Sequence, residues 1–454
     1  MSLFPTNLFA GETFAIVGLG RNGLPVARAL RAMGADVMAW DDSEAARQAA
    51  MAEGIPVADP TAGITTPRAM ILSPGIPHIR PRIHPAAAWA WENAVPIVSD
   101  AEILFTAVRR AGSRARFVGI TGTNGKSTTT ALLAHILAAS GVPSAAGGNL
   151  GIAALALPLL PDHGVYVLEM SSYMLERTTT LRFDAAAMLN LSPDHLDRHG
   201  DMNGYAAAKR QVFARQHAGN TAVIGIDDAL SRQMAEGLPG RVITISGFQS
   251  ADVWGDGSFL RDRLGPILDL KACPTLPGAH NAQNAAAVTA LAQTLGLSRA
   301  DIARHIPSYP GLPHRQQRVA AHADVVFIND SKATNADAAA RALGCYDRLV
   351  WIAGGMAKEG GIEALAEYFP RIAHAMLIGQ DAPVLAATLA AHGVPHTITG
   401  TLDNAVPTAF AAARAGGVPV VLLSPACASF DQFSGFDARG DRFAALAAGL
   451  RDAA

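Results

Sequence analysis

Short apolar runs alternate with longer, alanine-rich segments along most of the 454-residue chain. The runs have the length of β-strands; clear examples cover residues 14–17, 116–120, 165–169, 185–190 and 325–329. Segments such as 24–33 and 127–140 lie between them and repeat apolar residues with the period of an α-helix. Because parallel strands need crossover helices, this alternation predicts doubly wound, mostly parallel sheets and an α/β fold class.

Strand–loop–helix units begin afresh three times, near residues 14, 116 and 325. A loop-rich stretch at 109–114 separates the first two units. A stretch at 307–313, with three prolines and a glycine, separates the last two. We therefore predict three domains, at residues 1–110, 111–309 and 310–454.

Charge and cysteine content exclude some classes of protein. The chain has 36 Lys and Arg against 38 Asp and Glu, with no basic block, so nucleic acid is not an expected partner. Its three cysteines are scattered without metal-binding or redox spacing. No signal-peptide pattern opens the chain, and no apolar stretch reaches the roughly 18 residues of a membrane span, which predicts a cytoplasmic protein without membrane insertion.

The most specific motif is a polar, glycine-containing loop between a predicted strand and a predicted helix. Its candidate nucleotide-binding residues are Gly122, Thr123, Asn124, Gly125, Lys126, Ser127 and Thr128. Backbone N–H groups of such a loop can surround phosphate oxygens, the lysine can reach the β- and γ-phosphates, and the serine hydroxyl can ligate Mg²⁺. The spacing departs from the strict phosphate-loop pattern, because Gly119 lies six positions before Gly125. The strand–loop–helix context still favours nucleotide binding.

A second glycine pattern lies near the N-terminus. Gly18, Gly20 and Gly23 follow a predicted strand, and Asp41 and Asp42 end the next strand about 20 residues later. This is the fingerprint of a dinucleotide-binding domain and, taken alone, indicates an NAD-dependent oxidoreductase. The same arrangement suits any diphosphate at a helix N-terminus, including UDP.

Polar clusters follow two later strands and then a predicted helix. They are Glu169-x-Ser-Ser, Asn190-x-x-x-Asp-His195-x-Asp, and Lys209. Together with the Thr-Gly-Thr-Asn-Gly-Lys-Ser loop, their order and spacing resemble the central domain of the Mur ligases, relatives of the folylpolyglutamate synthetases. The resemblance spans residues 18–436 and implies a P-loop-type central ATPase domain between Rossmann-like N-terminal and C-terminal domains.

The resemblance also implies roles for individual residues. ATP and two Mg²⁺ ions are the expected cofactors, with Ser127, Glu169, His195 and a carbamylated Lys209 as metal ligands. Lys126, Asn149, His195 and Lys209 are the expected catalytic residues, Asn149 also contacting the substrate. Further ATP-binding residues would be Asn281, Asn284, Arg315, Asp330 and Lys332.

Two C-terminal segments, Gly354-Gly-Met-Ala-Lys358 and Leu423-Ser-Pro-Ala-Cys-Ala-Ser-Phe-Asp-Gln-Phe433, are similar to those of Mur ligases that add D-glutamate to UDP-N-acetylmuramoyl-L-alanine. Glutamate has two carboxylates, so its pocket needs a cation and hydrogen-bond donors. The residues implied for it are Thr334, Lys358, Ser429, Phe430 and Phe436. Those implied for the UDP substrate in the N-terminal domain are Asn22, Asp41, Asp42 and Ser73.

These observations predict a monomeric ligase that uses ATP to activate a carboxylate as an acyl phosphate. Its small-molecule partners would be UDP-N-acetylmuramoyl-L-alanine and D-glutamate. Two alternatives remain open at this point. One is a Mur-type or folate-type ligase with another amino acid. The other is a nucleotide-binding redox or regulatory protein that uses the N-terminal fingerprint.

Overall fold

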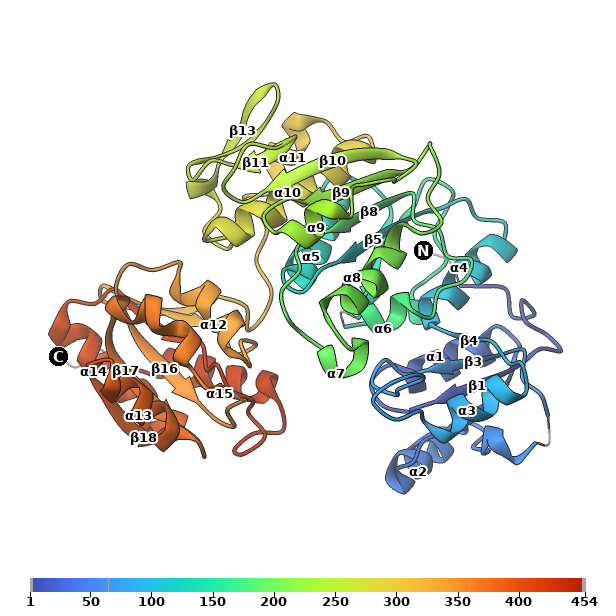
Figure 1. Ribbon diagram of the computed structural model, residues 1–454, viewed down its shortest axis with the longest axis horizontal. Helices are drawn as coiled ribbons and strands as arrows, with labels where there is room; N and C mark the ends of the chain where they lie inside the picture. The colour runs from blue at the N-terminus through green and yellow to red at the C-terminus, as the bar shows by residue number, and fades with distance from the viewer. Residues whose placement is uncertain (1–2, 64, 150, 359, 451–454) are drawn as a thin grey trace. The chain divides into compact units, whose positions relative to one another are not determined.

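A computed structural model describes residues 3–63, 65–149, 151–358 and 360–450 (Figure 1). It confirms the α/β class: three sheets, each with a parallel core, follow one another along the chain. Among the described residues, no helix has both the length and the apolar character needed to cross a lipid bilayer.

The first sheet has four parallel strands in the order β2-β1-β3-β4. Its strands are β1 (Thr13–Val17), β2 (Asp36–Trp40), β3 (Ala69–Leu72) and β4 (Ile97–Val98). The accompanying helices are α1 (Gly23–Ala32), α2 (Glu44–Ala52), α3 (Pro85–Glu92) and α4 (Asp100–Arg110). Alternate residues of β1 face opposite layers: Phe14 and Ile16 belong to a core shared with α1 and α4, whereas Ala15 and Val17 pack in the core that includes α3.

The second sheet has nine strands in the order β13-β12-β11-β10-β9-β8-β5-β7-β6. The strands are β5 (Arg116–Thr121), β6 (Ser144–Gly148), β7 (Val165–Glu169), β8 (Ala185–Met188), β9 (Thr221–Gly225), β10 (Arg241–Ser246), β11 (Val253–Gly255), β12 (Phe259–Asp262) and β13 (Gly265–Asp269). Those from β6 to β11 pair in parallel, and β11, β12 and β13 form an antiparallel extension. The helices are α5 (Lys126–Ala139), α6 (Ser172–Leu175), α7 (Leu196–His199), α8 (Met202–Arg210), α9 (Ala229–Gln233), α10 (Ala279–Thr294) and α11 (Arg299–His305).

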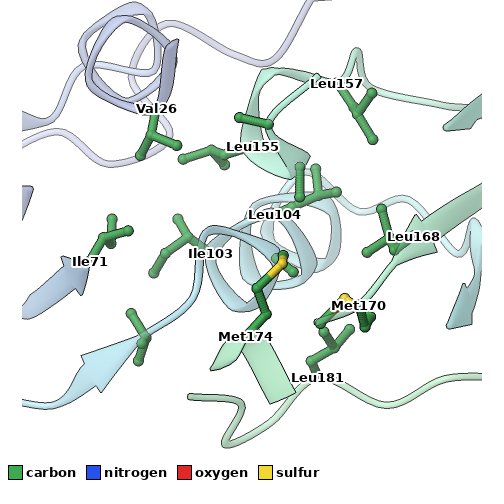
Figure 2. Packing of buried hydrophobic residues seen from close by; sticks show 14 of the residues in the cluster. Val26, Ile71, Ile103, Leu104, Leu155, Leu157, Leu168, Met170, Met174 and Leu181 are labelled. Atoms are coloured by element: carbon green, nitrogen blue, oxygen red, sulfur yellow. The ribbon is translucent and has the colours of Figure 1, made fainter. Parts of the chain in front are cut away.

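One apolar core joins the first sheet to the second (Figure 2). Ile103 and Leu104 of α4 lie between Val26 and Ile71 of the first sheet's layer and Leu168 of β7. Each large side chain buried in this way stabilises the packing by about 1.5–3 kcal/mol. Helix α4 therefore contributes to both layers, and residues 1–272 and 281–309 form one compact unit.

The second compact unit contains residues 273–280 and 310–454. Its sheet has the order β14-β15-β19-β16-β17-β18, and only the edge strand β14 is antiparallel. The strands are β14 (Gln317–His322), β15 (Val325–Asn329), β16 (Leu349–Gly354), β17 (Ile372–Ile378), β18 (His396–Gly400) and β19 (Val420–Leu423). The helical segments are α12 (Ala336–Leu343), η5 (Glu363–Arg371), α13 (Ala382–Ala391), α14 (Leu402–Gly416) and α15 (Phe436–Ala448). The domain boundaries predicted near residues 110 and 309 remain predictions.

Candidate active site

The glycine loop predicted to bind phosphate joins β5 to α5. Its backbone favours glycine at two positions, because Gly122 has φ +149° and Gly125 has φ +85°. A Cβ atom on Gly125 would lie 2.3 Å from Oδ1 of Asn284. Strand β5 lies between β7 and β8. The connection that leaves β5 leads to β6 on one side, whereas the connection that leaves the adjacent β7 leads to β8 on the other. The loop therefore occupies the switch point at which open α/β sheets bind ligands.

Two lysines approach the same carbonyl oxygen of this loop. Lys126 Nζ donates to the oxygens of Gly122 and Thr123, each at 2.7 Å, and Lys209 Nζ donates to the Gly122 oxygen at 2.9 Å. The Lys209 side chain is 1% exposed, and burial together with the nearby Lys126 charge places its pKa well below the ordinary value. The loop thus combines a cation suited to phosphate with a buried amine that is readily neutral.

The side-chain amides of Asn190 and Gln283 also hold this loop in place. Asn190 accepts from the Asn124 backbone N–H at 3.0 Å and donates back to the Asn124 carbonyl at 3.2 Å. The Asn190 side chain also donates to Gln283 Oε1 at 3.1 Å, and Gln283 donates to Asp227 Oδ2 at 2.8 Å. Sequence reasoning missed Gln283, although it lies between the two predicted ATP-binding asparagines. Those two, Asn281 and Asn284, are buried beside the loop within α10 and hydrogen-bond to each other at 3.0 Å.

Glu169 ends strand β7 and is 2% exposed. Its Oε1 accepts from Asn149 Nδ2 at 2.8 Å, whereas Oε2 has no hydrogen-bond donor among the residues that the structure describes. A buried carboxylate oxygen without a donor suits a divalent cation, which prefers oxygen ligands. Within the described ranges, no three His, Cys, Asp or Glu side chains cluster as a complete metal site.

His195 precedes α7 in the left-handed conformation, with φ +54°. Its ring lies between those of Tyr173 and Tyr205, at centroid distances of 5.1 and 6.3 Å, and its Nε2 is 3.4 Å from Asp194 Oδ2. Burial lowers the pKa of His195; Asp194 opposes this shift, while the nearby lysines reinforce it. A neutral imidazole is the form that can ligate a metal.

The first unit also contains a cavity of about 530 Å³ above the first sheet. Five predicted substrate residues line it: Asn22, Asp41, Asp42, Ser73 and Asn149. The Asp41 carboxylate accepts from the backbone N–H groups of Leu19 at 2.6 Å and Ser43 at 2.8 Å, so it shapes the glycine loop itself. Sequence reasoning missed three other lining residues, Arg21, Ile76 and His84. No motif marks Ile76 or His84.

In the second unit, predicted residues follow β15, β16 and β19. Asp330 is 8% exposed and accepts from Ser424 Oγ at 2.8 Å; burial raises its pKa to about 7. Lys332 Nζ lies 3.8 Å from the ring centre of Phe436. Arg315 lies near enough to Asp330 to lower that pKa partially.

The remaining predicted residues of this unit lie on two loops that touch. Met356 and Ala428 exchange two backbone hydrogen bonds of 2.9 Å, which brings the loop of Lys358 beside that of Ser429. Ser429 is buried, whereas Phe430 is 71% exposed. Thr334 lies in the turn between β15 and α12.

Sequence reasoning also missed a buried arginine, Arg439 of α15, which is 1% exposed. Its guanidinium donates to Oγ and the backbone O of Ser331 at 3.0 and 2.9 Å, and to the backbone O of Cys427 at 3.1 Å. It therefore connects the loop after β15 to the loop after β19.

Known proteins share this arrangement. Residues 120–292 match the Mur ligase middle domain, and residues 314–427 match the Mur ligase glutamate ligase domain. A UDP-N-acetylmuramoylalanine–D-glutamate ligase of Paramagnetospirillum magneticum is 50% identical over 447 residues, which cover 97% of each chain. A protein of the same name from Rhodospirillum rubrum is 48% identical, covering 99% of this chain and 97% of its own. The chain therefore belongs to the Mur ligase family, which confirms the resemblance seen in its motifs.

Solved structures agree on the fold. The UDP-N-acetylmuramate–alanine ligase of Thermotoga maritima superimposes with a TM-score of 0.61 at 18% identity, over 95% of this chain and 98% of that one. A murein peptide ligase from Psychrobacter arcticus gives 0.52 at 15% identity, over 98% of this chain and all of that one. At such identities the likeness concerns the fold alone.

Proposed function

We propose that this chain is an ATP-dependent ligase that joins D-glutamate to UDP-N-acetylmuramoyl-L-alanine during peptidoglycan precursor synthesis. The observation that carries the proposal is the near-half identity, over almost the whole length, to relatives named for this reaction. The phosphate loop beside a buried carboxylate supports it, because amide formation from a carboxylate needs activation by ATP.

The proposed nucleotide site is the loop from Gly122 to Thr128, with Asn281 and Asn284 on the side of the base. Ser127, Glu169, His195 and Lys209 would hold two Mg²⁺ ions, which neutralise phosphate charge when bound. The donor-free Oε2 of Glu169 fits such an ion. Arg315, Asp330 and Lys332 are the proposed nucleotide-binding residues of the second unit.

Lys209 is the proposed site of carbamylation. A protonated lysine cannot ligate a cation, but a neutral amine can form a bond to the carbon of CO₂ and lose one proton, giving an anionic carbamate with two oxygens. The burial of Lys209 and the nearby charge of Lys126 support this modification, because both disfavour a charged ammonium at Lys209.

The proposed reaction has two steps. First, a carboxylate oxygen of the alanyl group attacks the γ-phosphorus of ATP, the bond to the β–γ bridging oxygen breaks, and ADP leaves. The amine of D-glutamate then attacks the acyl carbon, loses a proton, and displaces inorganic phosphate. Lys126 stabilises the transferring phosphoryl group by its charge and Asn149 orients the substrate, while Lys358, Thr334, Ser429, Phe430 and Phe436 bind glutamate.

The substrate cavity of the first unit would take the UDP group of the precursor. Asn22 and the adjoining glycine loop would face the diphosphate, and Asp41, Asp42 and Ser73 would contact the nucleoside end. We further propose that the enzyme acts as a monomer in the cytoplasm, which light scattering and cell fractionation would test.

The decisive experiment measures phosphate release from ATP and Mg²⁺ with UDP-N-acetylmuramoyl-L-alanine and each of several amino acids. We expect release only with D-glutamate, with a matching mass gain in the UDP product, and none with L-glutamate, L-lysine or meso-diaminopimelate. Release with another amino acid would reassign the substrate within the family. Binding of NAD without any ATP turnover would contradict the proposal altogether.

A further inference from the structure

Arg177, two residues after α6, reaches from the second sheet's layer to the turn that follows β3. It is 2% exposed. Its Nη1 donates to the backbone oxygens of Leu72 at 2.9 Å and Ser73 at 3.2 Å, and its Nη2 donates to the backbone oxygen of Ile76. Within the described ranges, Arg177 has no ion-pair partner. Its charged guanidinium therefore donates hydrogen bonds to three carbonyl groups at one turn.

Two of these carbonyls belong to peptide units that contain no N–H group. Ser73 precedes Pro74, and Ile76 precedes Pro77, so neither peptide unit has an N–H group. The carbonyl oxygen is then the only polar group by which such a unit can be held. Arg177 donates to both oxygens, and the Ser73 oxygen also accepts from the Ile76 backbone N–H at 3.0 Å.

The turn in question forms part of the proposed substrate cavity, which Ser73, Pro74 and Ile76 line. A carbonyl oxygen that accepts from Arg177 is oriented toward the guanidinium rather than toward the cavity. This matters for an anionic ligand, since carbonyl oxygens repel phosphate oxygens. The Ser73 hydroxyl in turn donates to the Gly18 oxygen at 2.8 Å, so the position of the turn also determines that of the glycine loop.

A neighbouring histidine accepts a hydrogen bond from Arg177, and a second buried arginine approaches the same ring nitrogen. Arg177 Nε donates to His78 Nδ1 at 3.1 Å, and Arg198 Nη2 lies 2.6 Å from the same nitrogen. Burial and the two arginines lower the pKa of His78 to about 4, so the imidazole remains a neutral acceptor near neutral pH. Arg198 is itself paired with Glu176 at 3.1 Å. The cluster of Arg177, Arg198 and Glu176 therefore carries net positive charge.

We infer that Arg177 is a positioning residue for the UDP-linked substrate, acting through the carbonyl groups of residues 72–76. It would keep these oxygens away from the diphosphate and hold the glycine loop through Ser73. This inference rests on the proposed function, because that function places a diphosphate in the cavity.

The test compares Arg177→Met and Arg177→Lys with a matched control, Arg215→Met. Arg215 also donates to the segment after α6, to Leu181 O at 2.7 Å and Thr178 Oγ1 at 2.6 Å, but none of its recorded bonds reaches residues 72–78. For each full-length protein, calorimetry gives the Kd for UDP-N-acetylmuramoyl-L-alanine. Steady-state assays give kcat and the KM values for that substrate, ATP and D-glutamate.

We expect Arg177→Met to raise the Kd and KM for the UDP substrate about tenfold or more, with the other two KM values within about twofold. Arg177→Lys should give a smaller rise of the same selectivity, because an ammonium keeps the charge but lacks the planar fork. If the Arg177→Met variant does not fold, the KM values of Arg177→Lys decide whether Arg177 positions the UDP substrate. Arg215→Met should change none of the three KM values selectively.

Different failures have different meanings. If the wild type binds the UDP substrate and both Arg177 variants bind it equally well, the positioning role is wrong and the proposed function stands. A uniform change in all three KM values, or the same change in Arg215→Met, would assign Arg177 a structural role only. If the wild type does not bind the UDP substrate, both the inference and the proposed function are wrong.

Discussion

Replacing Gly125 by alanine should weaken ATP binding, because both the backbone and the space at this residue require glycine. The left-handed backbone, with φ +85°, costs a residue with a Cβ about 1–2 kcal/mol. The new Cβ would lie 2.3 Å from Asn284 Oδ1 and force that side chain to move. Asn284 would then lose its hydrogen bonds to Thr129 at 3.2 Å and Asn281 at 3.0 Å, each contributing about 1 kcal/mol.

These contributions add up to about 3–4 kcal/mol if the loop is kept in its present shape. If the loop changes shape instead, the same free energy corresponds to a loss of roughly two to three powers of ten in nucleotide affinity. Gly141 provides the matched control, because it follows the other end of the same helix, has φ +72°, and has no atom within 4 Å of an added Cβ. Gly141→Ala therefore carries the backbone cost alone.

The assay is the KM for ATP in the phosphate-release reaction, with thermal unfolding of both variants measured in parallel. We expect Gly125→Ala to show a KM for ATP at least about a hundredfold above wild type, or to lose about 2–4 °C in Tm for each kcal/mol that does not appear in the KM. Gly141→Ala should keep the wild-type KM. The reasoning is refuted if Gly125→Ala has a wild-type KM for ATP and a Tm equal to that of Gly141→Ala.

Three further substitutions test other parts of the site. Lys209→Arg should abolish most activity, because a guanidinium cannot be carbamylated. Intact-mass measurement should find one added CO₂ in the wild type only, and full activity of the variant would contradict the carbamate. Glu169→Gln should raise the Mg²⁺ concentration needed for half-maximal rate about tenfold or more, as its amide replaces a donor-free carboxylate oxygen. The pKa of Asp330 is about 7 in the folded protein and 3.8 in the unfolded chain. Between these pH values the folded state binds more protons, so the free energy of unfolding falls as pH rises from about 4 to about 7. The difference of roughly three pH units corresponds to at most about 4 kcal/mol, and urea unfolding of Asp330→Asn should lack this component of the pH dependence; an unchanged profile would show that Asp330 is not its source.

Features that depend on residues close together in the sequence could be predicted from it. The strand–loop–helix pattern predicted the glycine loop between β5 and α5, and the glycine pattern near Gly18 predicted a loop that lines the cavity of the first unit. The parallel sheet order then explains why the ends of β5, β7 and β8 meet, although their residues are dozens of positions apart.

Long-range contacts of single side chains could not be predicted in this way. Arg177 and Arg439 bind backbone carbonyls about 100 residues away in the sequence, and a carbonyl acceptor leaves no trace in residue identity. Asp41 illustrates a related limit. Its position after β2 suggested ligand binding, but its carboxylate also accepts from Leu19 N–H, which spacing alone does not reveal.

The contacts of Arg439 have a consequence for redesign. Its guanidinium donates mainly to backbone oxygens of the loops after β15 and β19. These hydrogen bonds therefore do not depend on most of the side chains in those loops. The side chains of these loops can therefore change while the backbone hydrogen bonds of Arg439 keep the loops in place. Under the proposed function, in which Lys358 binds glutamate, exchanging this side chain would admit a differently charged amino acid while the loops keep their conformation. On that proposal, the same loop support would serve variants that accept other amino acids.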